Sequence, residues 1–323
     1  MTAPVLSVRD LRVGFKSRQG ITQVLHGVSM DIASGEIVGM VGESGSGKST
    51  TPAAALGLMP RNAIVSGEVQ MAGLPVNVAR PKDARTDTRG KASVIFQQPM
   101  RAFSPYDRLE RQITDAIIAQ TGVSKKDAKE RALHGFERLK LPDPALALTK
   151  YPHQMSGGQL QRAMIALAFA CEPKLLICDE PTTALDVTVQ AQVIHMIRQM
   201  AEEDNVGVLF ITHDLGVVAE ICDRVYVMYA GRIAEENSVG ELLGKPRHRY
   251  SRALLNSTPV MGEKARFQTI PGNAPAAGAH IEGCAFADRC AAATTVCSLH
   301  PPSKTENNSG HFACHNPEPV EAA

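Results

Sequence analysis

The sequence contains no tryptophan, and aromatic residues make up only 4% of its 323 residues. This scarcity argues against a stacking platform for single-stranded nucleic acid. The charges nearly cancel, with 34 Lys and Arg against 33 Asp and Glu, so there is no overall basic field to attract nucleic acid. The longest apolar run, residues 163–171, is far shorter than the ~20 residues that span a bilayer.

Residues 1–4 show no charged segment leading into an apolar core, so we expect no signal peptide and a chain that stays in the cytoplasm. What the sequence does contain is 44% hydrophobic and 21% charged residues, which is typical of a folded globular protein. A chain of this length can bury one large core or two modest ones.

Short apolar segments alternate with helical ones through the first two thirds of the chain. Strands are expected at 5–15, 24–32, 37–41, 93–96, 174–178 and 206–211, and helices at 48–58, 109–141, 159–171 and 189–204. Residues 60–90 are expected to form turns with a short strand pair. This alternation predicts an α/β fold with a parallel sheet.

The composition shifts to Pro, Gly, Ala, Asn and Cys from about residue 246. We therefore expect one domain over residues 1–245 and a small loop-rich extension over residues 246–323.

Residues 42–49 read Gly-Glu-Ser-Gly-Ser-Gly-Lys-Ser, which matches the phosphate-loop pattern between an expected strand and an expected helix. Glycines let the backbone turn its N–H groups toward phosphates, and the helix N-terminus adds partial positive charge. Lys48 is expected to contact the β- and γ-phosphates, and the Ser49 hydroxyl to ligate Mg²⁺. The expected ATP contacts in this loop are Gly42, Glu43, Ser44, Gly45, Ser46, Gly47, Lys48, Ser49 and Thr50.

A second candidate site is the apolar segment Leu175 to Cys178, which ends in the carboxylates Asp179 and Glu180. In a phosphate-loop protein, such a strand end supplies an Asp that holds Mg²⁺ and a neighbouring acid that orients and polarises the attacking water. We assign the first role to Asp179 and the second to Glu180.

Four further segments resemble the motifs of the ABC ATPase family. Residues 155–159, Met-Ser-Gly-Gly-Gln, resemble the family signature with Met in place of the usual Leu. Residues 96–99 resemble the glutamine loop, 184–186 the D-loop and 211–214 the switch-histidine segment. The motifs occur in the family's order, and the resemblance covers about residues 5–240.

This resemblance implies a P-loop ABC ATPase with a RecA-like parallel core, an antiparallel β subdomain and a helical subdomain at about residues 100–158. It places Gln97 at the Mg²⁺ and water position, His213 against the γ-phosphate, and Asp186 in the D-loop. It also places Phe15 against adenine, although a core aromatic in a strand is the alternative for that residue.

The resemblance further implies that two ATPase domains close head to tail. The signature residues would then complete the ATP site of the partner, because a helix N-terminus offers N–H donors to an anion. These residues are Ser156, Gly157, Gly158 and Gln159.

The last third of the chain narrows the resemblance. Residues 249–259, 270–275 and 283–290 look like the C-terminal extension of ATPases from oligopeptide, dipeptide and nickel ABC importers. The implied function is an ATP-hydrolysing subunit that powers import of a peptide or a related small solute. It would sit peripherally on the cytoplasmic face of the cell membrane.

The implied partners are a second ATPase chain, two transmembrane permease subunits and an extracytoplasmic solute-binding protein, with no nucleic acid. The second ATPase could be a copy of this chain, but the resemblance favours a paralogue. The alternative function is a soluble, non-transport ABC ATPase that acts on nucleic acid or ribosomes. The 113 residues from Gly42 to Met155 instead fit a transporter's helical subdomain.

Four cysteines, Cys284, Cys290, Cys297 and Cys314, lie within 31 residues of the extension. In a reducing compartment, clustered thiols point to a metal rather than to disulfides. Their spacing selects neither zinc nor an iron–sulfur centre, and free thiols remain an alternative. The resemblance favours a [4Fe–4S] cluster, with Zn²⁺ as the alternative. The metal would brace a segment with little core of its own, or serve as a redox sensor of transport.

Pro52 departs from this pattern, because it is expected about four residues into the helix that follows the phosphate loop. There it would leave the Lys48 carbonyl without its helical partner and could kink the helix.

Overall fold

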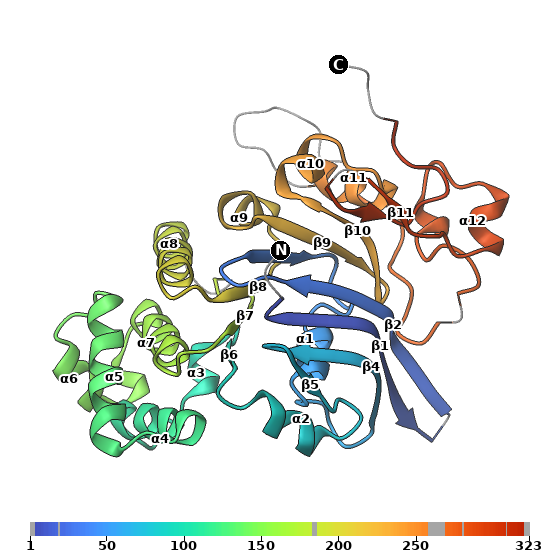
Figure 1. The fold of residues 1–323 in the computed structure, drawn as a ribbon. Coiled ribbons are helices and arrows are strands. Elements are labelled where there is room, and N and C mark those ends of the chain that lie inside the picture. The colour runs from blue at the N-terminus through green and yellow to red at the C-terminus, as the bar shows by residue number, and fades with distance from the viewer. Residues whose placement is uncertain are drawn as a thin grey trace.

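The computed structural model describes residues 4–18, 20–182, 186–257, 269–279, 281–307 and 309–319. Its centre is a sheet in the order β11-β12-β10-β9-β3-β8-β7-β6 (Figure 1). Neighbouring strands from β9 to β6 are parallel. They are β9 (Arg224–Tyr229), β3 (Ile37–Val41), β8 (Gly207–Ile211), β7 (Leu175–Asp179) and β6 (Ala92–Ile95).

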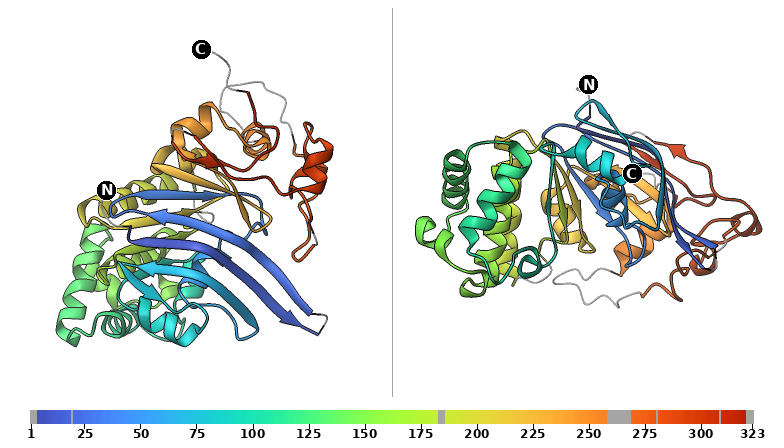
Figure 2. Two further views of the ribbon diagram at one scale, coloured as in Figure 1. Left: turned by 45° about the vertical axis from the view of Figure 1, so that its right-hand side comes forward. Right: turned by 90° about the horizontal axis from the view of Figure 1, so that it is seen from below.

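A second, antiparallel sheet has the order β2-β1-β4-β5. Its strands are β1 (Leu6–Ser17), β2 (Gly20–Ile32), β4 (Ala63–Met71) and β5 (Leu74–Val76), and the long first pair extends well beyond the core in Figure 2. The structure thus contains the expected antiparallel part beside a mixed sheet and helices. The helix α2 (Pro81–Thr88) follows β5 and was not expected, because its residues are mostly polar.

The helices between residues 99 and 203 gather on the side of the molecule opposite the C-terminal extension (Figures 1 and 2). The expected helix 109–141 is two helices, α4 (Leu109–Thr121) and α5 (Lys125–Arg138), separated by Gly122. Their neighbours are α3 (Pro99–Ala102), α6 (Pro144–Thr149), the short 3-10 turn η1 (Pro152–Gln154), α7 (Gly157–Ala170) and α8 (Val187–Glu203). No helix within the described ranges is long and apolar enough to cross a membrane.

The two faces of the parallel strands bury different partners, because alternate residues of a strand point to opposite sides. Leu176 and Cys178 pack in the core that contains α4, α5 and α7. Leu175 and Ile177 pack in the core that contains the antiparallel sheet and α1 (Thr50–Ala55). The helix after the phosphate loop and the signature helix α7 therefore cover opposite faces of the sheet.

The helix α9 (Leu215–Ile221) connects β8 to β9. After β9 the chain returns to the same sheet as β10 (Arg232–Ser238), and then forms α10 (Val239–Gly244) and α11 (Arg249–Asn256). The extension adds η2 (Ala287–Arg289), α12 (Thr295–Leu299), β11 (Thr305–Glu306) and β12 (His311–Phe312). The strand β12 pairs with β10, so the extension continues the sheet of the core.

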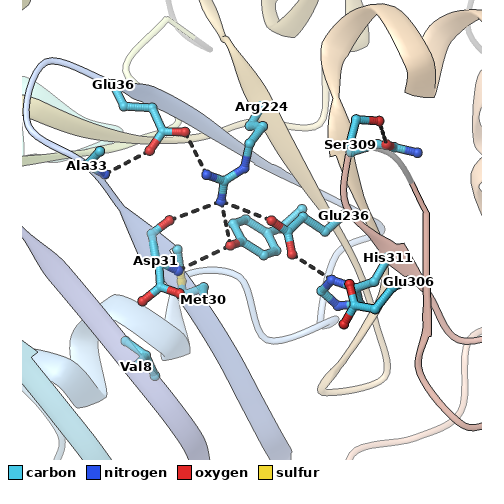
Figure 3. A network of polar contacts seen from close by, with 12 residues as sticks. Val8, Met30, Asp31, Ala33, Glu36, Arg224, Glu236, Glu306, Ser309 and His311 are labelled. Carbon is cyan, nitrogen blue, oxygen red and sulfur yellow. Dashed lines mark hydrogen bonds and ion pairs between the residues drawn. The ribbon is translucent and has the colours of Figure 1, made fainter. Parts of the chain in front are cut away.

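Ion pairs reinforce this attachment (Figure 3). The Arg224 guanidinium contacts Glu36 at 2.8 Å and Glu236 at 3.0 Å, and His311 Nδ1 lies 2.7 Å from the other Glu236 oxygen. Within the extension itself, Arg249 contacts Glu318 at 2.7 Å. The predicted boundary at residue 246 is therefore crossed by strand pairing and by buried charge contacts.

Candidate functional site

The phosphate loop lies at the carboxyl end of β3 and leads directly into α1. Gly42 has a φ of +149°, and a Cβ at that position would clash with the carbonyl oxygen of Met228. Only glycine therefore fits this close approach of two backbones. The expected helix 48–58 is shorter, since α1 begins at Thr50 and ends at Ala55.

Pro52 is less disruptive than the sequence suggested. Because α1 begins at Thr50, Pro52 lies in its first turn, the part of a helix that tolerates proline. Its neighbours still bond around it, with Thr51 N donating to Gly47 O at 3.1 Å and Ala53 N to Ser49 O at 3.3 Å. As expected, Pro52 itself offers no donor to the Lys48 carbonyl. The kink stays a prediction.

Lys48 is buried in the loop, with 7% of its surface exposed. Its Nζ donates to the carbonyl oxygens of Gly42 at 2.8 Å and Glu43 at 2.9 Å. Burial lowers the pKa of Lys48, and the negative charges of Glu180, Asp179 and Glu43 oppose that shift. The ammonium group is thus held against the loop with carboxylates nearby.

The structure brings the two predicted Mg²⁺ ligands of this loop and of β7 together. The Ser49 hydroxyl donates to Asp179 Oδ1 at 2.9 Å. Burial raises the pKa of Asp179, while the Ser49 hydrogen bond and the Lys48 charge lower it. A hydroxyl and a carboxylate are hard oxygen donors of the kind that Mg²⁺ prefers, so the pair fits that ion.

Glu180 lies between two other predicted residues. Gln97 Nε2, which follows β6, donates to Glu180 Oε2 at 2.8 Å, and His213 Nδ1, which follows β8, lies 3.2 Å from Glu180 Oε1. The Glu180 backbone has a φ of +49°, and its N–H donates to Ile211 O at 2.9 Å. Two residues that follow β6 and β8 therefore converge on the carboxylate that follows β7, the strand between them.

The signature residues form the N-terminus of α7. Ser156 Oγ accepts from Gln159 N at 3.3 Å, and Gln159 Oε1 accepts from Ser156 N at 3.1 Å, which is a capping box. A Cβ at Gly157 would meet nothing within 4 Å, so the helix end is open there, whereas a Cβ at Gly158 would lie 3.1 Å from Val189. The capping box holds the helix terminus in place without covering it.

The remaining predicted residues are more scattered. Asp186 caps α8, where its carboxylate accepts from Val189 N at 2.9 Å, while 184 and 185 lie outside the described residues. Phe15 is half-buried in β1 and packs against the core beneath the antiparallel sheet.

The sequence did not indicate which residues support the loop from behind. Gly231 N donates to Ser46 O at 2.9 Å, and the Tyr250 hydroxyl accepts from Glu43 N at 2.8 Å. Arg289 of the extension contacts the Glu43 carboxylate. All three contacts join residues far apart in the sequence, so no local pattern signals them.

None of the four cysteines of the extension is in a disulfide bond. Cys284 N donates to Cys297 O at 2.7 Å. Burial raises the pKa of Cys284 to about 11, and the proximity of Cys314, Cys297 and Cys290 adds to that rise. Across the described ranges, no three His, Cys, Asp or Glu side chains are arranged to hold a single metal ion. The thiols are therefore near one another without converging on one point.

Two protein families match the chain. The ABC transporter family matches residues 25–183, and the family of the oligopeptide/dipeptide transporter C-terminal region matches residues 234–297. A probable peptide ABC transporter ATP-binding protein of Sinorhizobium fredii is 45% identical over 96% of this chain and 93% of its own. An oligopeptide transport ATP-binding protein of Salmonella typhimurium is 40% identical over 97% of this chain and 94% of its own.

Solved structures agree at the level of the ATPase fold. A dimeric ATP-binding cassette in a post-hydrolysis state with ADP and Pi has a TM-score of 0.64 and 26% identity, and covers 72% of this chain and 98% of that chain. A component of an ABC transporter complex from Clostridium perfringens also has a TM-score of 0.64, with 25% identity, over 76% of this chain and 92% of its own.

Proposed function

The chain belongs to the family of ABC transporter ATP-binding subunits that carry the oligopeptide/dipeptide transporter C-terminal region, and we propose that its ATP hydrolysis drives import of a peptide or a related small solute. It is an ATP hydrolase of the ABC type. The observation that supports its mechanism best is the convergence of Gln97 and His213 on Glu180 beside the phosphate loop.

In this mechanism, the loop binds the triphosphate of ATP through its backbone N–H groups and Lys48. Ser49 and Asp179 would hold Mg²⁺, which neutralises charge on the β- and γ-phosphates when bound. The short Ser49–Asp179 distance supports this assignment. Thr50 opens α1, whose N-terminus points its partial positive charge toward the same phosphates.

Glu180 is the proposed water-orienting base. Its carboxylate accepts from Gln97 and contacts His213, and both partners restrict its position relative to an attacking water. His213 would contact the γ-phosphate, and Phe15 would pack against adenine at the edge of the site. Each of these roles rests on the family's motifs as well as on the residue positions.

Replacing Glu180 with Gln tests this assignment. We expect Glu180→Gln to retain ATP binding and to lower steady-state phosphate release about 100-fold or more, because general-base catalysis contributes about 10²–10⁴-fold. Both quantities are measured on the assembled transporter complex. The exposed Glu68 of β4 supplies the matched control, Glu68→Gln, which should hydrolyse ATP like the wild type. Near-wild-type turnover in Glu180→Gln would remove the role given to Glu180.

We propose that two ATPase chains close head to tail, so that the signature residues of one chain face the γ-phosphate held by the other. The open N-terminus of α7 supports this, as does its location on the opposite face of the sheet from α1. The partners would be a paralogous ATPase, two permeases and an extracytoplasmic binding protein. The complex would place this chain at the cytoplasmic face of the membrane.

We also propose that Cys284, Cys290, Cys297 and Cys314 hold a [4Fe–4S] cluster, with Zn²⁺ as the alternative. The proximity of Cys290, Cys297 and Cys314 to Cys284 supports a shared site.

Metal analysis of the complex tests this second proposal. Purified without oxygen, it should contain about four iron and four sulfide per copy of this chain if the centre is [4Fe–4S]. Cys290→Ser should lower the metal content and expose residues beyond about 270 to protease. Stoichiometric zinc without sulfide would show that the site holds Zn²⁺ and not an iron–sulfur cluster. The absence of any metal would overturn both the cluster and the zinc proposal.

A further inference from the structure

An arginine of the C-terminal extension reaches the phosphate loop. Arg289 ends the short 3-10 turn η2, and its two terminal nitrogens lie 2.6 and 2.9 Å from the two carboxylate oxygens of Glu43. The Arg289 side chain is 6% exposed and that of Glu43 is 26% exposed. A two-pronged arginine–carboxylate contact of this kind fixes orientation as well as distance.

The arginine is itself held firmly. Its Nε donates to Pro271 O at 2.8 Å, and one terminal nitrogen also donates to the Tyr229 hydroxyl at 3.1 Å. Its guanidinium lies 5.9 Å from the ring centres of both Tyr229 and Phe286. These partners come from the extension and from the end of β9. The position of the guanidinium group therefore depends on how the extension packs against the core.

Glu43 is fixed at three of its groups. Its carboxylate contacts Arg289, its N–H donates to the Tyr250 hydroxyl, and its carbonyl oxygen accepts from Lys48 Nζ. A shift of Glu43 would therefore move the carbonyl that aligns the lysine. The charge of Glu43 also acts on Lys48 directly.

The charge of Glu43 poses a problem for nucleotide binding. The loop is built to receive a triphosphate, yet its second residue carries a negative charge that would repel one. Arg289 cancels that charge from behind the loop with a side chain that is itself almost fully buried. Without the arginine, the carboxylate would be left partly buried and unpaired next to the bound phosphates.

From these contacts we infer that Arg289 is a positioning residue for ATP. It neutralises the charge of Glu43 and thereby orders the phosphate loop. The affinity for ATP then depends on how the C-terminal extension packs against the core. The inference rests on the proposed ATP site at Lys48. Because coupling between two sites is reciprocal, bound ATP should in turn stabilise the packing of the extension against the core.

A mutant cycle on the assembled complex tests this inference. Arg289→Met should weaken ATP binding about tenfold, within the 5- to 150-fold range of typical coupling, and raise the KM for ATP more than it lowers kcat. Arg289→Lys keeps the charge without the two-pronged contact, and should fall between Arg289→Met and the wild type. In the Glu43→Gln background, Arg289→Met should change affinity by no more than about threefold, because the charge that needs neutralising is gone.

Arg249→Met is the matched control, since Arg249 pairs with Glu318 at 2.7 Å inside the same extension and does not touch the loop. It should bind ATP like the wild type. An equal loss of affinity in both Glu43 backgrounds, or an equal loss in Arg249→Met, would overturn the inference and leave only a structural effect. Lys48→Ala tests the proposed ATP site independently of Arg289. If this variant binds ATP normally, the proposed ATP site is wrong.

Discussion

At the scale of single residues, the loop depends on positions that its own motif does not contain. The motif predicted Lys48, Ser49 and Asp179 from residue type and spacing, and the structure brings these three together. Gly231 has no such pattern around it, yet its N–H bonds to Ser46 and its carbonyl accepts from His26. Contacts between distant segments leave no local pattern, so sequence reasoning could not find them.

Gly231 gives a test of this support. Its φ is +75°, and a Cβ there would clash with the carbonyl of Val24. We expect Gly231→Ala to lower the free energy of unfolding by about 2–4 kcal/mol, the sum of backbone strain and a clash that the core cannot absorb, and to weaken ATP binding. Urea denaturation and ATP titration of the purified protein measure both.

Gly73 is the matched control, because its φ is +76° and a Cβ there would meet nothing within 4 Å. Gly73→Ala should therefore cost only the strain of the left-handed backbone, about 1 kcal/mol, and leave ATP affinity unchanged. Equal destabilisation by the two substitutions would show that the contact with Val24 contributes nothing.

At the scale of elements, the buried parallel strands were the most predictable part of the fold. The short apolar runs predicted β3, β7 and β8 to within a residue, because a strand covered on both faces has to be apolar throughout. The helix α2 was missed, since it is short, polar and begins at Pro81. The two-residue strands β11 and β12 are too short to show any period.

The error at Pro52 has the same origin. The sequence placed the helix start at Lys48, whereas the loop continues to Ser49 and α1 starts one residue later. A difference of two residues moves a proline from a helix interior, where it costs about 3 kcal/mol, to the first turn, where it is tolerated. Helix ends are set by the fold of the preceding loop, which the helical pattern does not encode.

At the scale of the whole molecule, the two halves of the proposed ATP site lie on different faces of one sheet. The side with α1 carries Lys48, and the side with α7 carries Ser156. Both lie toward the carboxyl ends of the strands, because α7 runs back along the sheet before β7 begins. Two chains in opposite orientation would bring each Lys48 opposite the other chain's Ser156.

Ser156→Arg tests this arrangement, because it places a bulky cation where the partner's γ-phosphate would lie. In a complex with a paralogous ATPase, we expect ATP to bind the Lys48 site of the mutant chain as in the wild type. The site of the partner should lose hydrolysis, since its donors come from this chain. Site-resolved nucleotide crosslinking and phosphate release measure the two sites separately.

Ser124→Arg is the matched control for the lost cap. Ser124 caps α5, a 14-residue helix like α7, through the Asp127 N–H at 3.2 Å. Each substitution removes one serine cap and costs a similar ~1 kcal/mol. Hydrolysis should therefore fail in the partner's site only for Ser156→Arg. If the mutant chain's own Lys48 site failed while the partner's site worked, each chain would complete its own site, and the head-to-tail arrangement would be wrong.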